Sequence, residues 1–320
     1  MEGQSLTVPA PAKLNLFLHV TGRRSDGYHT LESLMVLLDF GDTMTLTDRP
    51  DGAIELTQPL AGVPVESDLT YRAARLLQRH TGAAQGVSIS LDKRIPLGSG
   101  MGGGSSDAAS VMLALNRLWQ LDLPREELTK LGLTLGADVP FFLFGANAHV
   151  TGIGELLRPV TLPRLTFLIV VPPVHVATAD VFAAPQLTRD TPESDADAFS
   201  LDFGANDLQP VAAGAHRSVA TTLMALDEAD FSSCGRAALT GARMSGSGSA
   251  VFRVIERGFP VSEHGWRAVD DTEGDDWKFL QRIHYRARKL HGPDGNPVGG
   301  SKVICARGVH QHPLRDFAAK

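Results

Sequence analysis

A run rich in glycine and serine is the part of this chain whose composition points most directly to chemistry. It lies between a strand-like segment, Val87–Leu91, and an apolar segment with helical spacing, Ala108–Trp119. Glycine permits positive φ angles and a close approach of an anion to the backbone. A helix that begins at the end of the run directs free N–H groups and the positive end of its dipole at that anion. The run therefore predicts a phosphate-binding loop that comprises Pro96, Leu97, Gly98, Ser99, Gly100, Met101, Gly102, Gly103, Gly104, Ser105 and Ser106.

The spacing within this run separates it from two other phosphate-binding motifs. No Gly-Lys-Ser/Thr follows it, as a Walker loop requires, and its glycines do not have the dinucleotide-binding spacing after an early strand. A flexible linker is the alternative interpretation. Linkers are not normally followed directly by an apolar helical pattern, so the sequence favours the phosphate-binding loop.

Two charged side chains in apolar surroundings are candidates for catalysis. Lys13 interrupts an apolar strand pattern, so its ammonium lies either in water at a strand edge or inside a site, and the sequence favours neither. Asp138 lies between Ala137 and the apolar run Val139–Phe142. Burial raises the pKa of a carboxyl group and a nearby cation lowers it, so a carboxylate there needs a partner. Its more usual role would be that of a helix cap or a turn residue.

The histidines do not predict a metal site. His310 and His312 have no acidic or cysteine residues around them at the spacing of zinc ligands. Tyr28 and His29 follow the turn predicted at Ser25–Gly27, and from their residue types alone they would be surface residues.

The composition is that of an ordinary soluble globular protein. The chain has 320 residues, of which 43% are hydrophobic and 21% charged, a length typical of about two domains. The net charge of −6 argues against a nucleic-acid partner, so local donors must hold any anionic ligand. No apolar run is long enough to span a membrane. The two cysteines form no framework and the N-terminus shows no leader, which predicts a cytoplasmic location, and no protein partner is indicated.

Strands and helices are mixed along the chain, which predicts an α+β or α/β class. The expected strands are Leu6–Leu18, Leu31–Phe40, Val87–Leu91, Ala148–Thr151, Leu165–Val171 and Ala250–Ile255. The expected helices are Leu69–Arg79, Ala108–Trp119, Pro124–Leu135 and His216–Leu226. Thr43–Thr47 and Ala53–Thr57 alternate on either side of an Asp-Gly turn and predict a hairpin.

Several motifs, taken together and in this order, resemble those of the GHMP small-molecule kinases. They are Pro11–Leu16, Asp26–His29, the glycine-serine run Pro96–Ser106, Gly136–Phe141 and Met244–Gly248. The glycine-serine run is general to that superfamily. The motifs Pro11–Leu16 and Asp26–His29 resemble more specifically the branch that acts on a cytidine-diphosphate sugar alcohol. The resemblance covers about Val8 to Val251.

This resemblance implies an α+β fold in two domains, with the active site between them. The first domain, residues 1–158, is expected to bind ATP and to contain an unusual left-handed βαβ unit. The second, residues 159–320, is expected to be a ferredoxin-like α/β domain. The default for such connections is right-handed, so the spacing of elements alone would not have suggested the crossover.

The resemblance also implies the roles of individual residues. ATP with Mg²⁺ is expected in the glycine-serine loop, with Ser105 or Ser106 near the metal. Lys13 and Asp138 are expected to flank the acceptor hydroxyl of the sugar alcohol. The residues that match substrate-binding positions are Asn15, Tyr28, His29 and Phe182.

Two departures limit this transfer. Asp68 stands where the family more usually has asparagine, so no adenine contact is assigned there. The chain also continues beyond Val251 through a basic helical pattern, Phe279–Leu290, which makes its tail longer than expected. Two alternative functions stay open. One is a GHMP kinase for homoserine, mevalonate or a sugar, and the other is an inactive nucleotide-binding regulator, against which the presence of both Lys13 and Asp138 argues.

Overall fold

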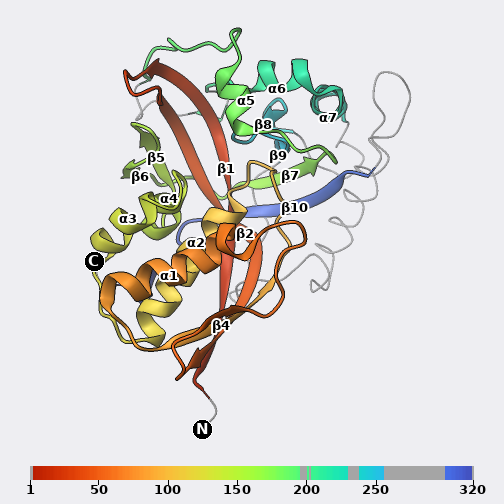
Figure 1. Cartoon of the computed structure of the whole chain (residues 1–320). Helices are drawn as coiled ribbons and strands as arrows, with labels where there is room; N and C mark the ends of the chain where they lie inside the picture. Colours follow the sequence, from red (N-terminus) through yellow and green to blue (C-terminus); the bar gives the residue numbers. More distant parts are fainter. Residues whose placement is uncertain (1–2, 195–199, 202, 230–237, 256–299, 319–320) are drawn as a thin grey trace.

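A computed structural model describes residues 3–194, 200–201, 203–229, 238–255 and 300–318. The basic pattern Phe279–Leu290 lies outside the described residues. In Figure 1 a long two-stranded ribbon runs through the molecule, with one group of helices beside its lower part and another near its upper end. Among the described helices, none has the length and apolar character that crossing a bilayer requires.

The ribbon consists of β1, Ser5–Arg23, and β2, His29–Arg49, which pair antiparallel along their whole length. Both strands are mostly buried, because layers of the structure cover them on either face. β2 continues without a break past Gly41, where a Cβ would lie only 2.3 Å from the carbonyl oxygen of Ala10. This ribbon therefore contains three of the predicted strands: Leu6–Leu18 in β1, and Leu31–Phe40 and Thr43–Thr47 in β2.

The predicted hairpin between Thr43–Thr47 and Ala53–Thr57 is wrong. β3, Ile54–Leu56, pairs in parallel with β4, Gly86–Asp92, and β4 lies between β3 and β2. Alternation predicts which face of a strand is buried but does not identify the strand's partner. The connection from β3 to β4 passes through α1, Leu69–Thr81, so this part of the chain is a βαβ unit. Its handedness stays a prediction.

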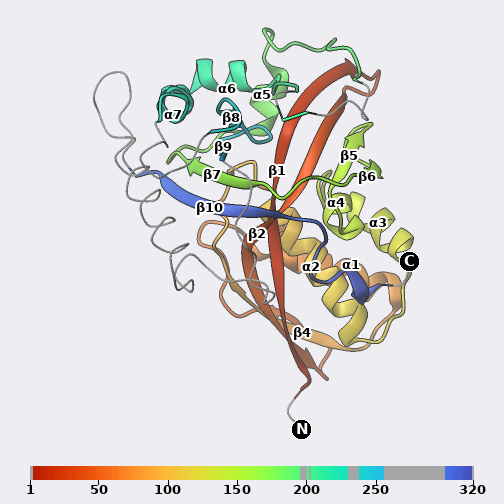
Figure 2. The ribbon, with the colours of Figure 1, turned by 180° about the vertical axis from the view of Figure 1, so that it is seen from behind.

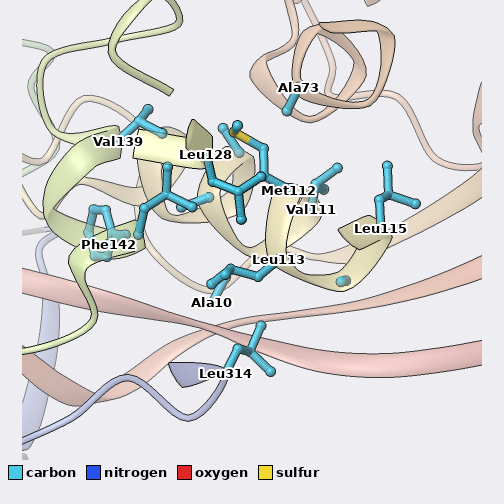
Figure 3. Packing of buried hydrophobic residues seen from close by; sticks show 14 of the residues in the cluster. Ala10, Ala73, Val111, Met112, Leu113, Leu115, Leu128, Val139, Phe142 and Leu314 are labelled. Atoms are coloured by element: carbon cyan, nitrogen blue, oxygen red, sulfur yellow. The ribbon is translucent and has the colours of Figure 1, made fainter. Parts of the chain in front are cut away.

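Four helices form the layer beside the ribbon: α1, α2 (Gly103–Leu118), α3 (Arg125–Leu133) and α4 (Val139–Phe144). α2 is the central one, and its side chains from Ser106 to Asn116 are all buried. Figure 3 shows the core around it, where Val111, Met112 and Leu115 meet side chains of the neighbouring elements. This packing fixes the position of the first turn of α2, which contains the last residues of the glycine-serine run.

The second half of the chain adds strands β7 (Thr166–Val171), β8 (Arg243–Met244), β9 (Val251–Ile255) and β10 (Lys302–Val309). The helices there are α5 (Thr178–Ala183), α6 (Gln209–Ala215) and α7 (Arg217–Asp227). The short strands β5 (Ala148–Thr151) and β6 (Leu156–Pro159) pair beside β2.

β10 connects the two halves of the molecule. It pairs with β7 over its length, and its end pairs with β2 through Gly308 and Val309, as Figure 2 shows from behind. The chain after β10 then returns to the helical layer, where Leu314 joins the core around α2. The mixed order of strands and helices confirms the α+β class. The predicted boundary between residues 158 and 159 stays a prediction, because β10 and the residues after it contact both halves.

Candidate active site

A cleft of about 660 Å³ opens between the glycine-serine run, the middle of the ribbon and α5. Its walls combine elements from both halves of the chain, which lie far apart in the sequence. Most of the candidate residues line it: Lys13, Asn15, Pro96, Leu97, Gly98, Ser99, Gly100, Gly102, Gly103, Gly104, Ser105, Asp138 and Phe182.

The first part of the glycine-serine run is a loop that needs glycine. Gly98, Gly100 and Gly102 have φ angles of +63°, +72° and +73°. A Cβ at Gly100 would lie 2.1 Å from the carbonyl oxygen of Ser245, so the loop packs directly on a second glycine-serine run, Ser245–Ser249. The hydroxyl of Ser245 also donates to the carbonyl oxygen of Gly100, at 3.0 Å. These contacts fix the loop without filling the cleft that it faces.

The last part of the run is helix, not loop, because α2 begins at Gly103, five residues before the predicted start. The backbone N–H groups of its first turn have no partner within the helix, and Gly103, Gly104 and Ser105 line the cleft. The two serines differ in orientation. Ser106 is fully buried and its hydroxyl donates to the carbonyl oxygen of Pro11 at 2.6 Å, so Ser105 is the serine that faces the cleft.

Met101 lies beneath the loop and does not line the cleft. Its side chain is fully buried, and its carbonyl oxygen accepts a 3.0 Å hydrogen bond from the backbone N–H of Lys13. Met101 therefore connects the loop to β1.

Lys13 and Asp138 lie together in the wall of the cleft. The Lys13 Nζ atom is 3.4 Å from Asp138 Oδ2, although the two residues are on β1 and just before α4. The ammonium is buried and also donates to the side-chain oxygen of Asn15. The Asp138 side chain is 32% exposed, and although it stands at the N-cap position of α4 it caps no backbone N–H. The cap role considered for Asp138 is therefore not observed, and its carboxylate faces the cleft beside a cation.

Asn15 is fixed by a chain of hydrogen bonds. Its amide nitrogen donates to the Ser33 hydroxyl at 2.8 Å, and that hydroxyl donates to the carbonyl oxygen of Phe17 at 2.6 Å. The backbone N–H of Asn15 donates to the Ser245 hydroxyl at 3.2 Å. Asn15 thus orients the Lys13 ammonium and connects it to the second glycine-serine run.

A second lysine in the cleft was not predicted. The Lys93 ammonium lies between two buried carboxylates, those of Asp42 and of Asp107, which is 2.8 Å away. Burial opposes its charge, but the two carboxylates outweigh that effect and raise the pKa of Lys93. Its place at the end of a predicted strand, directly before the loop, was the only sequence signal.

The three aromatic residues expected to bind substrate do not all line the cleft. The rings of His29 and Phe182 stack, with centroids 5.1 Å apart and planes at 27°. Tyr28 is 63% exposed, and neither Tyr28 nor His29 lines the cleft itself, whereas Phe182 does. The structure therefore places an aromatic pair at the edge of the cleft, with Tyr28 in the exposed turn before β2.

Asp68 has a structural role that accounts for its presence. It is the N-cap of α1, and its Oδ1 atom accepts hydrogen bonds from the backbone N–H of Thr70 at 2.8 Å and from the Thr70 hydroxyl at 2.5 Å. Among the described residues, no group of three or more His, Cys, Asp or Glu side chains is arranged to hold a metal ion.

Comparisons with known proteins agree with this geometry. Residues 68–146 match the model of the GHMP kinase N-terminal domain. The chain is 52% identical to the 4-diphosphocytidyl-2-C-methyl-D-erythritol kinase of Thiobacillus denitrificans, in an alignment that covers 98% of this chain and 99% of the relative. The alignment covers both chains nearly from end to end, and the expectation of a longer tail stays a prediction.

Solved structures give the same result. A crystal structure of 4-(cytidine 5'-diphospho)-2C-methyl-D-erythritol kinase matches with a TM-score of 0.70 and 31% identity, covering 95% of this chain and 100% of that one. The homoserine kinase from Cytophaga hutchinsonii matches with a TM-score of 0.56 at 19% identity, over 96% of this chain and 95% of that one, and shares the fold. The chain belongs to the 4-diphosphocytidyl-2-C-methyl-D-erythritol kinase family of the GHMP kinases.

Proposed function

We propose that this chain transfers the γ-phosphoryl group of ATP to the 2-hydroxyl of 4-diphosphocytidyl-2-C-methyl-D-erythritol, in the non-mevalonate route to isoprenoid precursors. The observation that carries the proposal is the Lys13–Asp138 pair, at 3.4 Å, in the wall of the cleft that the glycine-serine loop lines. Phosphoryl transfer needs a group that orients and deprotonates the acceptor and a positive charge near the transferring group. This pair supplies both.

Asp138 acts as the base in this proposal. An alcohol is a very weak acid, so its attack is assisted when a carboxylate accepts the proton while the bond to phosphorus forms. The Asp138 carboxylate is partly exposed and uses no oxygen for a helix cap, so it is free to accept that proton. Lys13 holds the carboxylate in place and offsets the negative charge that spreads over the transferring group.

The loop and the first turn of α2 fit the triphosphate of ATP. The cleft exposes Gly103 and Gly104 at the start of a 16-residue helix, where free N–H groups bind anions. Since the described residues offer no metal cage, Mg²⁺ would be held by the phosphates and the Ser105 hydroxyl, as is usual for this ion. When bound, Mg²⁺ neutralises charge on the phosphates.

The cytidine end of the substrate is assigned to the aromatic pair at the edge of the cleft. Phe182 lines the cleft and His29 stacks on it, while Tyr28 is exposed in the adjacent turn and free to cover a base. Asn15 is assigned to the polar part of the substrate, because it lines the cleft beside Lys13.

The test is ATP consumption with a panel of alcohols: the cytidine-diphosphate substrate, its uridine counterpart, homoserine, mevalonate and galactose. We expect turnover with the cytidine compound at a kcat/KM at least about 10²-fold above that of any alcohol without a base. Turnover with homoserine or mevalonate instead would assign the chain to another kinase activity. ATP binding without turnover on any alcohol would indicate a nucleotide-binding regulator.

A further inference from the structure

Arg189 contacts the aromatic pair in a way that the proposed catalysis does not use. Its Nε donates to His29 Nε2 at 3.0 Å, across 160 residues of sequence. Its terminal nitrogens donate to the carbonyl oxygens of Leu187 at 3.0 Å, Phe182 at 2.9 Å and Ala184 at 2.7 Å. One guanidinium therefore connects the His29 ring to the end of α5, which carries the ring that stacks on His29.

This contact determines which nitrogen of His29 carries the proton. A guanidinium has donors only, so the Nε2 atom of His29 must accept. A neutral imidazole has one donor and one acceptor, and the proton is then on Nδ1. Burial lowers the pKa of His29, and the positive charges of Arg189 and Arg23 lower it further, which agrees with a neutral ring. The Nδ1–H group has no partner within the described part of the chain.

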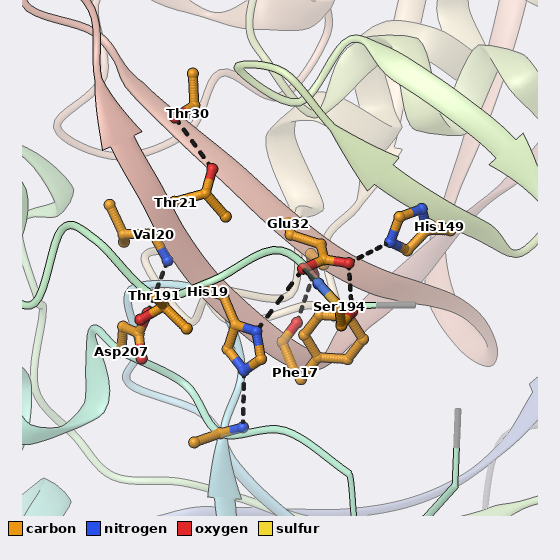
Figure 4. A network of polar contacts seen from close by, with 12 residues as sticks. Phe17, His19, Val20, Thr21, Thr30, Glu32, His149, Thr191, Ser194 and Asp207 are labelled. Carbon is orange, nitrogen blue, oxygen red and sulfur yellow. Dashed lines mark hydrogen bonds and ion pairs between the residues drawn. The ribbon is translucent and has the colours of Figure 1, made fainter. Parts of the chain in front are cut away.

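The segment that carries Arg189 is fixed at its other end as well. Glu32 lies at the centre of the polar contacts that hold this end, which Figure 4 shows. Its buried carboxylate accepts from the backbone N–H of Ser194 at 2.8 Å and from the Ser194 hydroxyl, and it lies 2.8 Å from His149 Nε2. Between these ends, the Thr191 N–H donates to the carbonyl oxygen of Val20 at 3.1 Å. The segment after Arg189 is thus held against the ribbon at Thr191 and Ser194.

We propose that Arg189 is a positioning residue for base recognition, which holds His29 as the neutral Nδ1–H tautomer against Phe182. His29 then presents a hydrogen-bond donor to the base. Cytosine has an acceptor at N3, whereas uracil has an N3–H donor, so a donor at this point favours cytosine. Stacking alone tolerates either base, and a buried donor that meets another donor leaves both unpaired. This proposal rests on the proposed function, in which His29 and Phe182 border the cytidine.

The first measurement needs no substrate. Nitrogen-15 NMR of the full chain, with the His29 ring assigned by its loss in His29→Gln, reports which ring nitrogen is protonated. We expect Nδ1–H in the wild type and in Arg23→Gln, a matched control that removes a charge next to His29 without removing a hydrogen bond. In Arg189→Gln we expect a shift toward the Nε2–H form. A wild-type ring with its proton on Nε2 would overturn the proposal.

The second measurement is the ratio of KM values for uridine and cytidine substrates. We expect Arg189→Gln to lower that ratio about tenfold, the worth of one hydrogen bond, while kcat at saturation changes little. Ser194→Ala loosens the same segment but keeps the Arg189–His29 contact, so it should keep the ratio. Should Arg189→Gln fail to fold, Arg189→Lys keeps the charge but cannot hold the ring and the carbonyls together.

The outcomes separate the two proposals. An unchanged ratio in a folded Arg189 variant, or an equal loss in Ser194→Ala or Arg23→Gln, would overturn the role of Arg189. If the wild type does not use the cytidine substrate at all, the proposed function fails. The NMR result would still decide whether Arg189 sets the tautomer of His29.

Discussion

Two lysines lie on either side of the glycine-serine loop, Lys13 buried and Lys93 partly buried, and their surroundings differ. A Cβ at Gly102 would lie 3.0 Å from the Cγ atom of Lys13, and a Cβ at Gly103 would lie 2.8 Å from the Nζ atom of Lys93. The loop therefore passes directly over both side chains. Lys13 has one carboxylate partner, Asp138, which is partly exposed to the cleft. Lys93 has two carboxylate partners, and both are buried.

This difference in surroundings suits Lys13 to catalysis and Lys93 to stabilising the fold. The two buried acids offset the charge of Lys93, and one of them, Asp42, also accepts from the backbone N–H groups of Arg94 at 2.6 Å and Ile95 at 2.7 Å. This arrangement fixes the chain at the start of the loop. The partner of Lys13 makes no such backbone contact, so that pair can reorganise when a phosphate and an alcohol arrive. We call the Lys13–Asp138 pair the Lys13 end of the loop, and Lys93 with Asp42 and Asp107 the Lys93 end. We expect mutations at the Lys13 end to change kcat and mutations at the Lys93 end to change stability.

The largest effect is expected at the Lys13 end. Asp138→Asn should bind both substrates about normally and lose on the order of 10²–10⁴ in kcat, roughly 3–5 kcal/mol. Lys13→Met should lose a comparable factor. Groups that act as a unit are not additive, so the double variant should lose little more than either single one. Steady-state kinetics of the four proteins, with their thermal midpoints as a check of folding, make this test.

The contrary result would be clear. Fully additive losses in kcat would mean that Lys13 and Asp138 work independently. A large fall in the thermal midpoint of Lys13→Met would mean that both lysines stabilise the fold, and the comparison between the two ends would fail.

The next effect is expected at the Lys93 end. Asp42→Asn removes a fully buried charge that pairs with Lys93, and breaking a buried ion pair of this kind costs about 3 kcal/mol of unfolding free energy. Asp51→Asn is the matched control, because Asp51 pairs with Arg49 at the surface, where solvent screens an ion pair and its loss changes stability little. Urea unfolding measures both. An equal, small cost in the two variants would contradict the assigned role of Asp42.

The two ends also differ in how far the sequence predicts them. The glycine-serine run and its neighbouring motifs marked the loop, Lys13 and Asp138, because each lies in a local pattern. The Lys93 site could not be predicted in this way. Asp42 becomes its neighbour through the pairing of β2 with β4, which brings Thr43 opposite Asp92, and Asp107 comes from the second turn of α2. No local pattern of residues identifies such a register.

The same limit explains the errors in the fold. Helix α1 was predicted almost to the residue, because its cap at Asp68 and its apolar spacing are local signals. The early start of α2 was missed because glycines are poor helix formers, and here the packing of the helix decides. The contact from Arg189 to His29 spans 160 residues and involves residue types that are common on surfaces. Only the folded chain brings them together.

A smaller effect, on ATP binding, is expected at two neighbouring glycines in the first turn of α2, Gly103 and Gly104. Gly104→Ala adds a methyl group in the cleft, 3.3 Å from Leu69 Cδ1, which a small movement of that side chain relieves. We expect ATP to bind about tenfold more weakly, or about 1.4 kcal/mol, because the methyl group occupies space that a phosphate would use. The thermal midpoint should hold or rise, because alanine favours a helix. Calorimetric titration with a non-hydrolysable ATP analogue measures the change.

Gly103→Ala provides the comparison. Its methyl group would lie 2.8 Å from the Lys93 ammonium and 3.0 Å from Ile95, so it should reduce stability as well as ATP affinity. If Gly104→Ala binds the analogue as the wild type does, the triphosphate does not lie against the first turn of α2.

The smallest effect is expected from Asp107→Asn, and it is the most selective test of the Lys93 end. Burial raises the pKa of Asp107 well above its usual value; Lys93 opposes this rise and Asp42 adds to it. One of its oxygens, Oδ1, is buried without a hydrogen-bond partner among the described residues. A raised native pKa means that the folded chain holds this proton more tightly than the unfolded chain does. Stability from this group is therefore lost as pH rises from about 4 toward the native pKa.

Asparagine cannot ionise, so the stability of Asp107→Asn relative to the wild type should increase as pH rises from 4 to 8. At pH 8 we expect its unfolding free energy to lie within about 1 kcal/mol of the wild-type value or above it, because Lys93 keeps its pair with Asp42 and the variant removes a carboxyl group whose ionisation is opposed by burial. Urea unfolding at a series of pH values measures the trend. The opposite trend, in which Asp107→Asn becomes less stable relative to the wild type as pH rises, would show that the folded chain does not hold the Asp107 proton more tightly than the unfolded chain does.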